Sequence, residues 1–161
     1  MPAAGLFVLR LGLAIVSVTH GLHTLFGVMG GPGVGPGGLS QTGAQFTAMG
    51  LPGGFLIALI AGLAQLVGGV LIVVGYLVRW AAVTLAALTA ILAWKSQMYY
   101  GFFLNWVLDA GRGHGIEFSV VLFAAYVCLA LTGGGEWSFD GGRAKRRSYV
   151  AAGRARLRGH N

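Results

Sequence analysis

The stretch LGLAIVSVTHGLHTLFGVMGGPGVGPGGLSQTGAQFTAMGLPGGFLIALIAGLAQLVGGVLIVVGYLV, residues 11–78, contains no aspartate, glutamate, lysine or arginine. One helical bilayer crossing takes about 20 apolar residues, so this stretch can hold two crossings and a connection. The glycines and prolines that follow residue 27 break any continuous helix. We therefore expect the first crossing at residues 5–27 and the second at residues 53–77.

The rest of the chain has the same apolar character. The 161 residues are 56% hydrophobic and only 9% charged, whereas soluble domains carry about 25% charged residues. So few polar residues cannot cover a water-soluble core. A third crossing is expected at residues 80–100, directly after a short turn, and a fourth at residues 116–131. The sequence therefore predicts an all-α integral membrane four-helix bundle whose first crossing is retained rather than cleaved.

The positions of lysine and arginine predict the orientation of this bundle. Seven of the 11 basic residues lie from Arg143 to Arg158, and the predicted topology places Arg10 and Arg79 on the same side. The opposite side receives only Lys95 and Arg112. Because short cytoplasmic segments accumulate positive charge, we expect both termini in the cytoplasm.

The positive charge also divides the chain into two parts. Residues 1–142 form the expected membrane domain, and residues 143–161 form a basic cytoplasmic tail that we expect to be flexible. Each basic residue near an anionic membrane surface contributes about 1 kcal/mol, so the tail is explained as a membrane anchor. Docking to a protein partner is the alternative. Nucleic acid is not an expected partner, because no recognition element accompanies the charge.

Polar residues inside the first crossing are candidates for function, because burying them in hydrocarbon is costly. At 100° per residue, Arg10, Ser17, His20 and Thr24 form one stripe, and His23 lies near the outer end. The i, i+3 spacing of His20 and His23 lets two imidazoles approach one ligand. A structural pair of histidines is the alternative, and we predict no metal site because no second set of ligands is evident.

The later crossings add fewer polar candidates. Gln65 lies near the middle of the second crossing on a face with Ala58, Gly62 and Gly69, where small residues permit close helix packing. Lys95 and Glu117 lie near the expected outer surface, and a simple ion pair between Glu117 and Lys95 or Arg112 is as plausible as a catalytic role. The expected inward face of the fourth crossing is Glu117, Val121, Ala124 and Cys128.

Motifs of self-contained chemistry are missing from the sequence. It contains no P-loop, GxSxG, HExxH or CxxC motif, and its single cysteine, Cys128, excludes an internal disulfide framework. Electron transfer by this chain would therefore need a partner protein or a lipid-soluble cofactor.

Short motifs occur along the chain in a characteristic order. They are RLG at residues 10–12, HGL at 20–22, FTAMGLP at 46–52, QLVGG at 65–69, GFFLNW at 101–106, GIEF at 115–118 and GGGEWSFD at 133–140. Their order and spacing resemble the DoxX/DoxD-like family of small bacterial membrane proteins. The resemblance implies a four-helix protein of the bacterial cytoplasmic membrane. This chain departs from the family in carrying Gln65 where glutamate is common, and an amide cannot titrate.

The resemblance also implies a function. Some members of this family are associated with quinone-linked sulfur oxidation, as the small subunit of a thiosulfate:quinone oxidoreductase, and others with membrane redox assemblies. We therefore expect a subunit that supports quinone-linked electron transfer, with a membrane quinone as cofactor and another redox protein as partner. A structural accessory subunit and a small-solute pathway are the alternatives.

The expected quinone site lies where polar side chains from three crossings converge toward the outer half of the bundle. His20 and Glu117 are the expected proton-exchanging residues, since imidazole and carboxylate are the usual exchangers. The expected quinone-binding residues are His20, His23, Gln65 and Lys95.

Overall fold

The computed structural model describes residues 2–30, 35–107 and 113–158, and these residues are helical or irregular, with no strand among them. The predicted all-α class is confirmed for this part of the chain. The elements in order are α1 (Pro2–Phe26), α2 (Leu39–Ala48), α3 (Gly54–Val74), α4 (Val78–Ser96), the 3-10 turn η1 (Met98–Tyr100), α5 (Glu117–Thr132) and α6 (Phe139–Arg158).

Three of these helices, α1, α3 and α4, are long and apolar enough to cross a membrane. They coincide with the first three predicted crossings. The third crossing was predicted to reach residue 100, whereas α4 ends at Ser96 and is followed by η1. The fourth predicted crossing corresponds to α5, which is apolar but only 16 residues long. The chain is thus a multi-pass membrane protein with three full-length apolar helices in its described residues.

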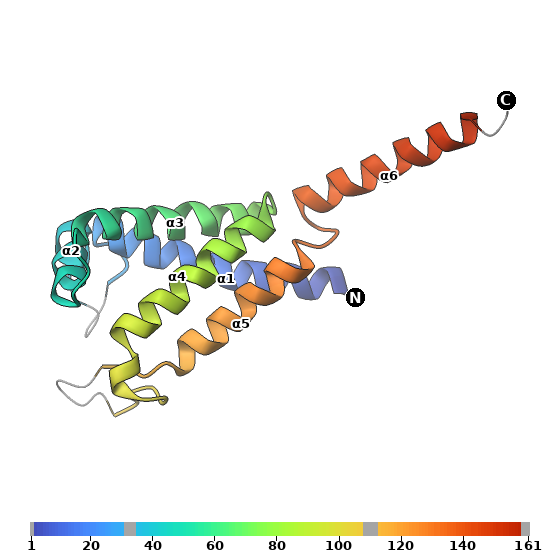
Figure 1. Ribbon diagram of the computed structural model, residues 1–161. Coiled ribbons are helices and arrows are strands. Elements are labelled where there is room, and N and C mark those ends of the chain that lie inside the picture. The colour runs from blue at the N-terminus through green and yellow to red at the C-terminus, as the bar shows by residue number, and fades with distance from the viewer. Residues whose placement is uncertain (1, 31–34, 108–112, 159–161) are drawn as a thin grey trace.

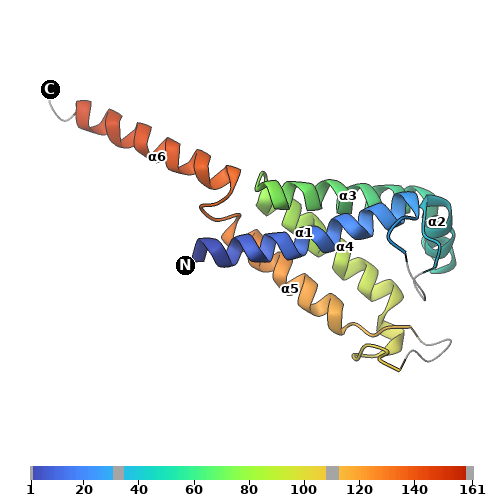
Figure 2. The same cartoon turned by 180° about the vertical axis from the view of Figure 1, so that it is seen from behind.

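The apolar helices pack as two pairs, α1 along α3 and α4 along α5. The pairs meet near the turn between α3 and α4 and diverge toward α2 (Figures 1 and 2). Glycines allow the close approach of α1 and α3: a Cβ added to Gly21 would lie 2.6 Å from the Leu66 nitrogen, and one added to Gly69 would lie 2.9 Å from Ser17 Cβ. The small-residue face predicted for the second crossing is therefore the face that packs against α1.

Arg10 ties this meeting point together, and its side chain is only 1% exposed. Its guanidinium donates to the carbonyls of Ile72 at 2.8 Å and Val73 at 2.7 Å, at the end of α3. It also donates to the carbonyls of Gly134 at 3.2 Å and Trp137 at 2.8 Å, beyond α5. Carbonyls at a helix C-terminus lack partners within the helix and favour a cation. Arg10 therefore has a structural role, and we call this cluster of bonds the arginine lock.

A second set of bonds fastens the start of α6 to the α3–α4 turn. The Val78 N–H donates to Asp140 Oδ2 at 3.1 Å, and the Asp140 N–H donates to the Gly75 carbonyl at 3.0 Å. Gly75 has φ 82°, a left-handed conformation that ends α3 and that glycine adopts without steric cost. The Ser138 hydroxyl also accepts from the Gly141 N–H at 2.9 Å. The serine and the aspartate of the GGGEWSFD motif therefore both have structural roles.

Two segments contain helices that the sequence did not predict. The connection between the first two crossings contains α2, which packs on α3, with Gly43 so close to Phe55 that an added Cβ would lie 2.8 Å from its Cα. The basic tail, predicted to be flexible, is helical as part of α6, which starts at Phe139 and extends away from the other helices (Figure 1). Alanine, arginine and lysine are strong helix formers, which accounts for the helix. The expected domain boundary at residue 142 falls inside α6.

Candidate functional site

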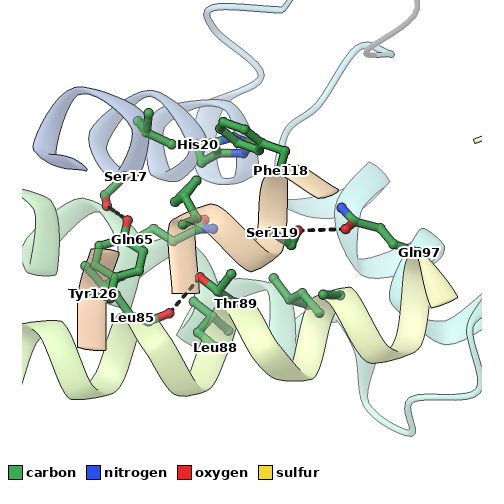
Figure 3. Close-up of a pocket in the computed structure, with 14 residues that line it drawn as sticks. Ser17, His20, Gln65, Leu85, Leu88, Thr89, Gln97, Phe118, Ser119 and Tyr126 are labelled. Atoms are coloured by element: carbon green, nitrogen blue, oxygen red, sulfur yellow. Dashed lines mark hydrogen bonds between the residues drawn. The ribbon is translucent and has the colours of Figure 1, made fainter. Parts of the chain in front are cut away.

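A cavity of about 130 Å³ lies among α1, α3, α4 and α5, on the diverging side of the two helix pairs (Figure 3). We call it the central cavity. Its walls are mostly aliphatic, with polar side chains from all four helices and from the residue after α4. The polar residues that line it are Ser17, His20, Gln65, Thr89, Gln97, Ser119 and Tyr126.

Ser17 and Tyr126 join α1 to α5 at this cavity, and each is 2% exposed. Their hydroxyl oxygens lie 2.5 Å apart. The Ser17 hydroxyl donates to the Leu13 carbonyl at 2.9 Å, so its single hydrogen is already used. Tyr126 must therefore donate to Ser17, and both hydroxyls are committed to the structure.

The hydroxyls of Ser119 and Thr89 are also committed. Ser119 donates to Gln97 Oε1 at 2.6 Å, which links α5 to the end of α4. Thr89 donates to the Leu85 carbonyl of its own helix at 2.8 Å. Figure 3 shows both bonds beside the cavity. These groups shape the cavity and have no remaining hydrogen to offer a ligand.

Gln65 and His20 differ from the other polar residues of the cavity. Gln65 Oε1 is buried and has no hydrogen-bond partner among the described residues. A buried acceptor without a partner costs about 1 to 3 kcal/mol. The His20 ring makes no hydrogen bond in the described part of the chain, and His20 is exposed at the cavity edge. Gln65 Oε1 and the His20 ring are therefore available to a ligand in one cavity.

A second cavity, of about 190 Å³, lies on the α2 side of the same residues and is lined by His20, His23 and Gln65. His20 and Gln65 thus border both cavities. The His23 Nδ1 lies 3.2 Å from the Val28 carbonyl oxygen, and Gly37 packs against the ring so closely that a Cβ there would collide with it. The structure brings the two histidines to one cavity, with His23 engaged by the loop after α1.

Glu117 and Lys95 line neither cavity. Glu117 Oε2 accepts from the Leu104 N–H at 3.2 Å, which fastens the loop before α5. Lys95 is exposed and lines a separate surface pocket with Met49. The two residues form no ion pair in the described part of the chain, and Arg112, the other expected partner of Glu117, lies outside the described residues.

A family model described as DoxX matches residues 5–97, which is more than half of the chain and includes most of α1 and all of α2, α3 and α4. The chain belongs to the DoxX family. Searches of curated proteins and of solved structures found no match. In this DoxX protein, His20 and Gln65 lie within the matched residues, whereas α5 and the GGGEWSFD segment follow them.

The face of α5 that lines the cavity of this DoxX protein differs from the predicted one. Val121, Ala124 and Cys128 are exposed, so the predicted inward face points outward. Ser119 and Tyr126 are the buried polar residues instead. α5 is apolar on all sides, so hydrophobicity does not reveal its inward face. The usable signal was the spacing of Ser119 and Tyr126, since residues seven apart share one face of a helix.

The described residues of this DoxX protein contain no group of three or more histidine, cysteine, aspartate or glutamate side chains placed to hold a metal ion. The cavity instead offers the His20 imidazole and two amides, Gln65 and Gln97, within an aliphatic wall, and Gln97 Oε1 already accepts from Ser119. This combination suits a mostly apolar ligand with one or two polar atoms.

Proposed function

We propose that this DoxX protein spans the bacterial cytoplasmic membrane four times and binds the headgroup of a membrane quinone in the central cavity. It acts as a subunit of a membrane redox complex, and the electrons come from a partner protein. The observation that carries this proposal is the pair of uncommitted polar groups, Gln65 Oε1 and the His20 ring, in a cavity whose other hydroxyls are already bonded.

The distribution of charge supports the topology. Arg10, Arg79 and the basic α6 lie at the end where the helix pairs meet, and Lys95 lies at the other end of α4. Short cytoplasmic segments are rich in lysine and arginine, so the arginine-lock end faces the cytoplasm. Both termini then lie in the cytoplasm, and the central cavity opens in the outer half of the membrane.

The size of the cavity supports a ring-shaped ligand. Its volume of about 130 Å³ is close to the ~150 Å³ of an engineered apolar cavity that binds benzene. One six-membered ring therefore fits. His20 on α1 and Phe118 on α5 are both exposed at the cavity edge, and α1 contacts α5 only sparsely. A long isoprenoid chain can leave toward the lipid between these helices.

The polar groups suit the reduced form of such a ring. A bound quinone supplies two-electron, two-proton chemistry. A quinol hydroxyl satisfies Gln65 Oε1, which has no donor among the described residues. The His20 ring can exchange a proton, because one nitrogen of a neutral imidazole donates a proton and the other accepts one. Gln65 itself cannot exchange a proton. Glu117 and Lys95 are not part of this site, since they line neither cavity.

Titration of the purified protein with a single-ring quinol that carries a decyl chain tests the proposal. Gln65→Leu should weaken binding about tenfold, since a neutral hydrogen bond contributes up to ~1.5 kcal/mol. His20→Ala should weaken binding and stop partner-coupled turnover. Thr89→Val is the matched control, because Thr89 lines the same cavity but its hydroxyl is already bonded, and its affinity should stay within about twofold. Equal affinity in wild type and Gln65→Leu would contradict the proposed site.

A structural accessory subunit is the second candidate function. It is favoured by the arginine lock and the Ser17–Tyr126 bond, which show that several polar groups of the membrane domain serve packing alone. Mild detergent extraction followed by mass analysis distinguishes the candidates. An accessory subunit copurifies with its partner without any quinone, and the His20→Ala variant then leaves the activity of the complex unchanged.

A further inference from the structure

A groove of about 440 Å³ lies where the end of α3 meets the start of α6 and is distinct from both cavities described above. It is lined by Leu71, Val74, Tyr76, Phe139 and Arg143. The side chains of Val74 and Phe139 are each 55% exposed. The groove is therefore a site on the outer surface of the protein, at the end of a membrane-spanning helix.

Arg143 is the one charged residue among the described residues that line this groove. It is exposed and forms no ion pair in the described part of the chain. Asp140, the acidic residue nearest in sequence, accepts the Val78 N–H instead. The guanidinium carbon lies over the Phe139 ring, 5.7 Å from the ring centroid. A guanidinium in this state can bind a phosphate through two parallel hydrogen bonds.

The aromatic residues hold Arg143 beside the end of α3. The Tyr76 and Phe139 rings meet edge to face with centroids 5.7 Å apart. Phe139 thereby packs the first turn of α6 against Tyr76, two residues after the end of α3. The chemical order along the groove is then aliphatic at Leu71 and Val74, aromatic at Tyr76 and Phe139, and cationic at Arg143.

This order matches the order of chemical regions across one leaflet of a phospholipid bilayer. Acyl chains lie beside the aliphatic end of a crossing helix, aromatic rings lie at the interface, and basic side chains reach the phosphates. Basic pockets beside crossing helices bind anionic lipid headgroups. Arg146 and Arg147, three and four residues after Arg143, are exposed on the same helix and add positive charge.

We propose that this groove binds an anionic phospholipid, with its phosphate on Arg143 and the upper part of an acyl chain along Leu71 and Val74. The proposal rests on the membrane location of α3 and not on the quinone site. Its ligand is a lipid and not a soluble phosphate, because most of the groove wall is apolar. The bound lipid would hold the first turn of α6 at the membrane surface, and the rest of α6 extends away from the other helices (Figure 2).

The test uses the full chain, delipidated in a neutral detergent and titrated with dioleoyl phosphatidylglycerol or dioleoyl phosphatidylcholine, with bound lipid counted by native mass spectrometry. We expect the first bound phosphatidylglycerol to have at least fivefold higher affinity than phosphatidylcholine. This factor corresponds to the ~1 kcal/mol typical of one basic residue at an anionic surface. Arg143→Gln should remove this preference, whereas Arg143→Lys should keep part of it.

Arg79→Gln is the matched control. Arg79 is exposed at the same end of the molecule, next to Gly133, but does not line the groove. Its substitution should change the affinity less than twofold. Val74→Trp, which fills the apolar wall, should weaken both lipids, and glycerol 3-phosphate should not compete.

Three results would overturn the proposal. One is equal affinity for the two lipids, and another is an equal loss of preference in Arg143→Gln and Arg79→Gln, which indicates unspecific attraction of charge. The third is full competition by glycerol 3-phosphate, which indicates a soluble anion site. Quinol affinity measured on the same Arg143→Gln sample should be unchanged, so failure of this proposal is distinguishable from failure of the quinone site.

Discussion

The two ends of α1 carry polar residues of the same stripe, yet their surroundings are opposite. At one end Arg10 donates to four backbone carbonyls and is almost fully buried. At the other end the His20 ring has no hydrogen bond in the described residues and borders two cavities with Gln65. The contrast shows that a polar residue in a membrane helix becomes a candidate for function when its hydrogen-bonding groups are left over, not when it is merely buried.

The largest expected effect comes from breaking the arginine lock. Arg10→Met removes the donors of four carbonyls and should lower the free energy of unfolding by about 3 to 5 kcal/mol in total, since each buried acceptor left without a donor costs about 1 to 3 kcal/mol. Arg10→Lys should rescue little of this loss, because an ammonium group cannot reproduce the planar fork of donors. The yield of monodisperse protein and the Tm in detergent measure the effect. A Tm equal to wild type in Arg10→Met would show that the lock is not structural.

The contact between α1 and α3 gives the next largest effect. Gly21→Ala places a Cβ against the Leu66 backbone and should destabilise the protein by about 1 to 3 kcal/mol through overpacking. Gly12→Ala on the same helix is the control, since nothing lies within 4 Å of an added Cβ there. That variant should be neutral or more stable, because alanine has the higher helix propensity. Thermal unfolding of the two variants side by side checks the pair, and similar Tm values would contradict it.

The Ser17–Tyr126 bond should contribute less. Tyr126→Phe removes one neutral hydrogen bond and should cost about 0.5 to 1.5 kcal/mol. A double-mutant cycle with Ser17→Ala isolates the interaction, since the two residues are in contact. A coupling energy near zero would place the link between α1 and α5 elsewhere.

The smallest expected effect on stability is at Gln65. Gln65→Leu removes an acceptor that has no partner in the described residues, so the Tm should be equal to or slightly above that of wild type. Loss of ligand affinity without loss of stability would show that Gln65 binds the ligand and does not hold the helices together. A Tm drop as large as that of Arg10→Met would show instead that Gln65 holds the helices together.

The sequence predicted the positions of the apolar helices well, because a charge-free stretch as long as residues 11–78 permits few arrangements in lipid. It also singled out His20 and Gln65, since polar residues inside apolar helices are conspicuous; both line the central cavity, and their role in binding stays a prediction. It missed α2, whose apolar residues do not form a long periodic pattern, and the helical start of the tail. The inward face of α5 could not be predicted from hydrophobicity, because Tyr126 and Cys128 have equally apolar neighbours in the sequence. Only Tyr126 points inward and bonds to Ser17, whereas Cys128 is exposed.

The expected grouping of Glu117 and Lys95 with the histidines rested on depth in the membrane alone. Depth does not specify the direction in which a side chain points. The Lys95 side chain is exposed on the surface of α4, and the Glu117 carboxylate accepts a hydrogen bond from the Leu104 N–H in the preceding loop. Tertiary contacts of the loop before α5, which no local pattern encodes, decided the position of Glu117.

The short length of α5 has a mechanical consequence for the surrounding bilayer. Its 16 residues rise about 24 Å at 1.5 Å per residue, whereas the hydrocarbon core is about 30 Å thick. As the fourth crossing, α5 would force the adjacent lipid to thin, at a cost of a fraction of a kcal/mol per Å of mismatch. Burying this side of the protein against another membrane protein relieves that deformation. The elastic energy of the bilayer would thus favour assembly at the exposed face of α5.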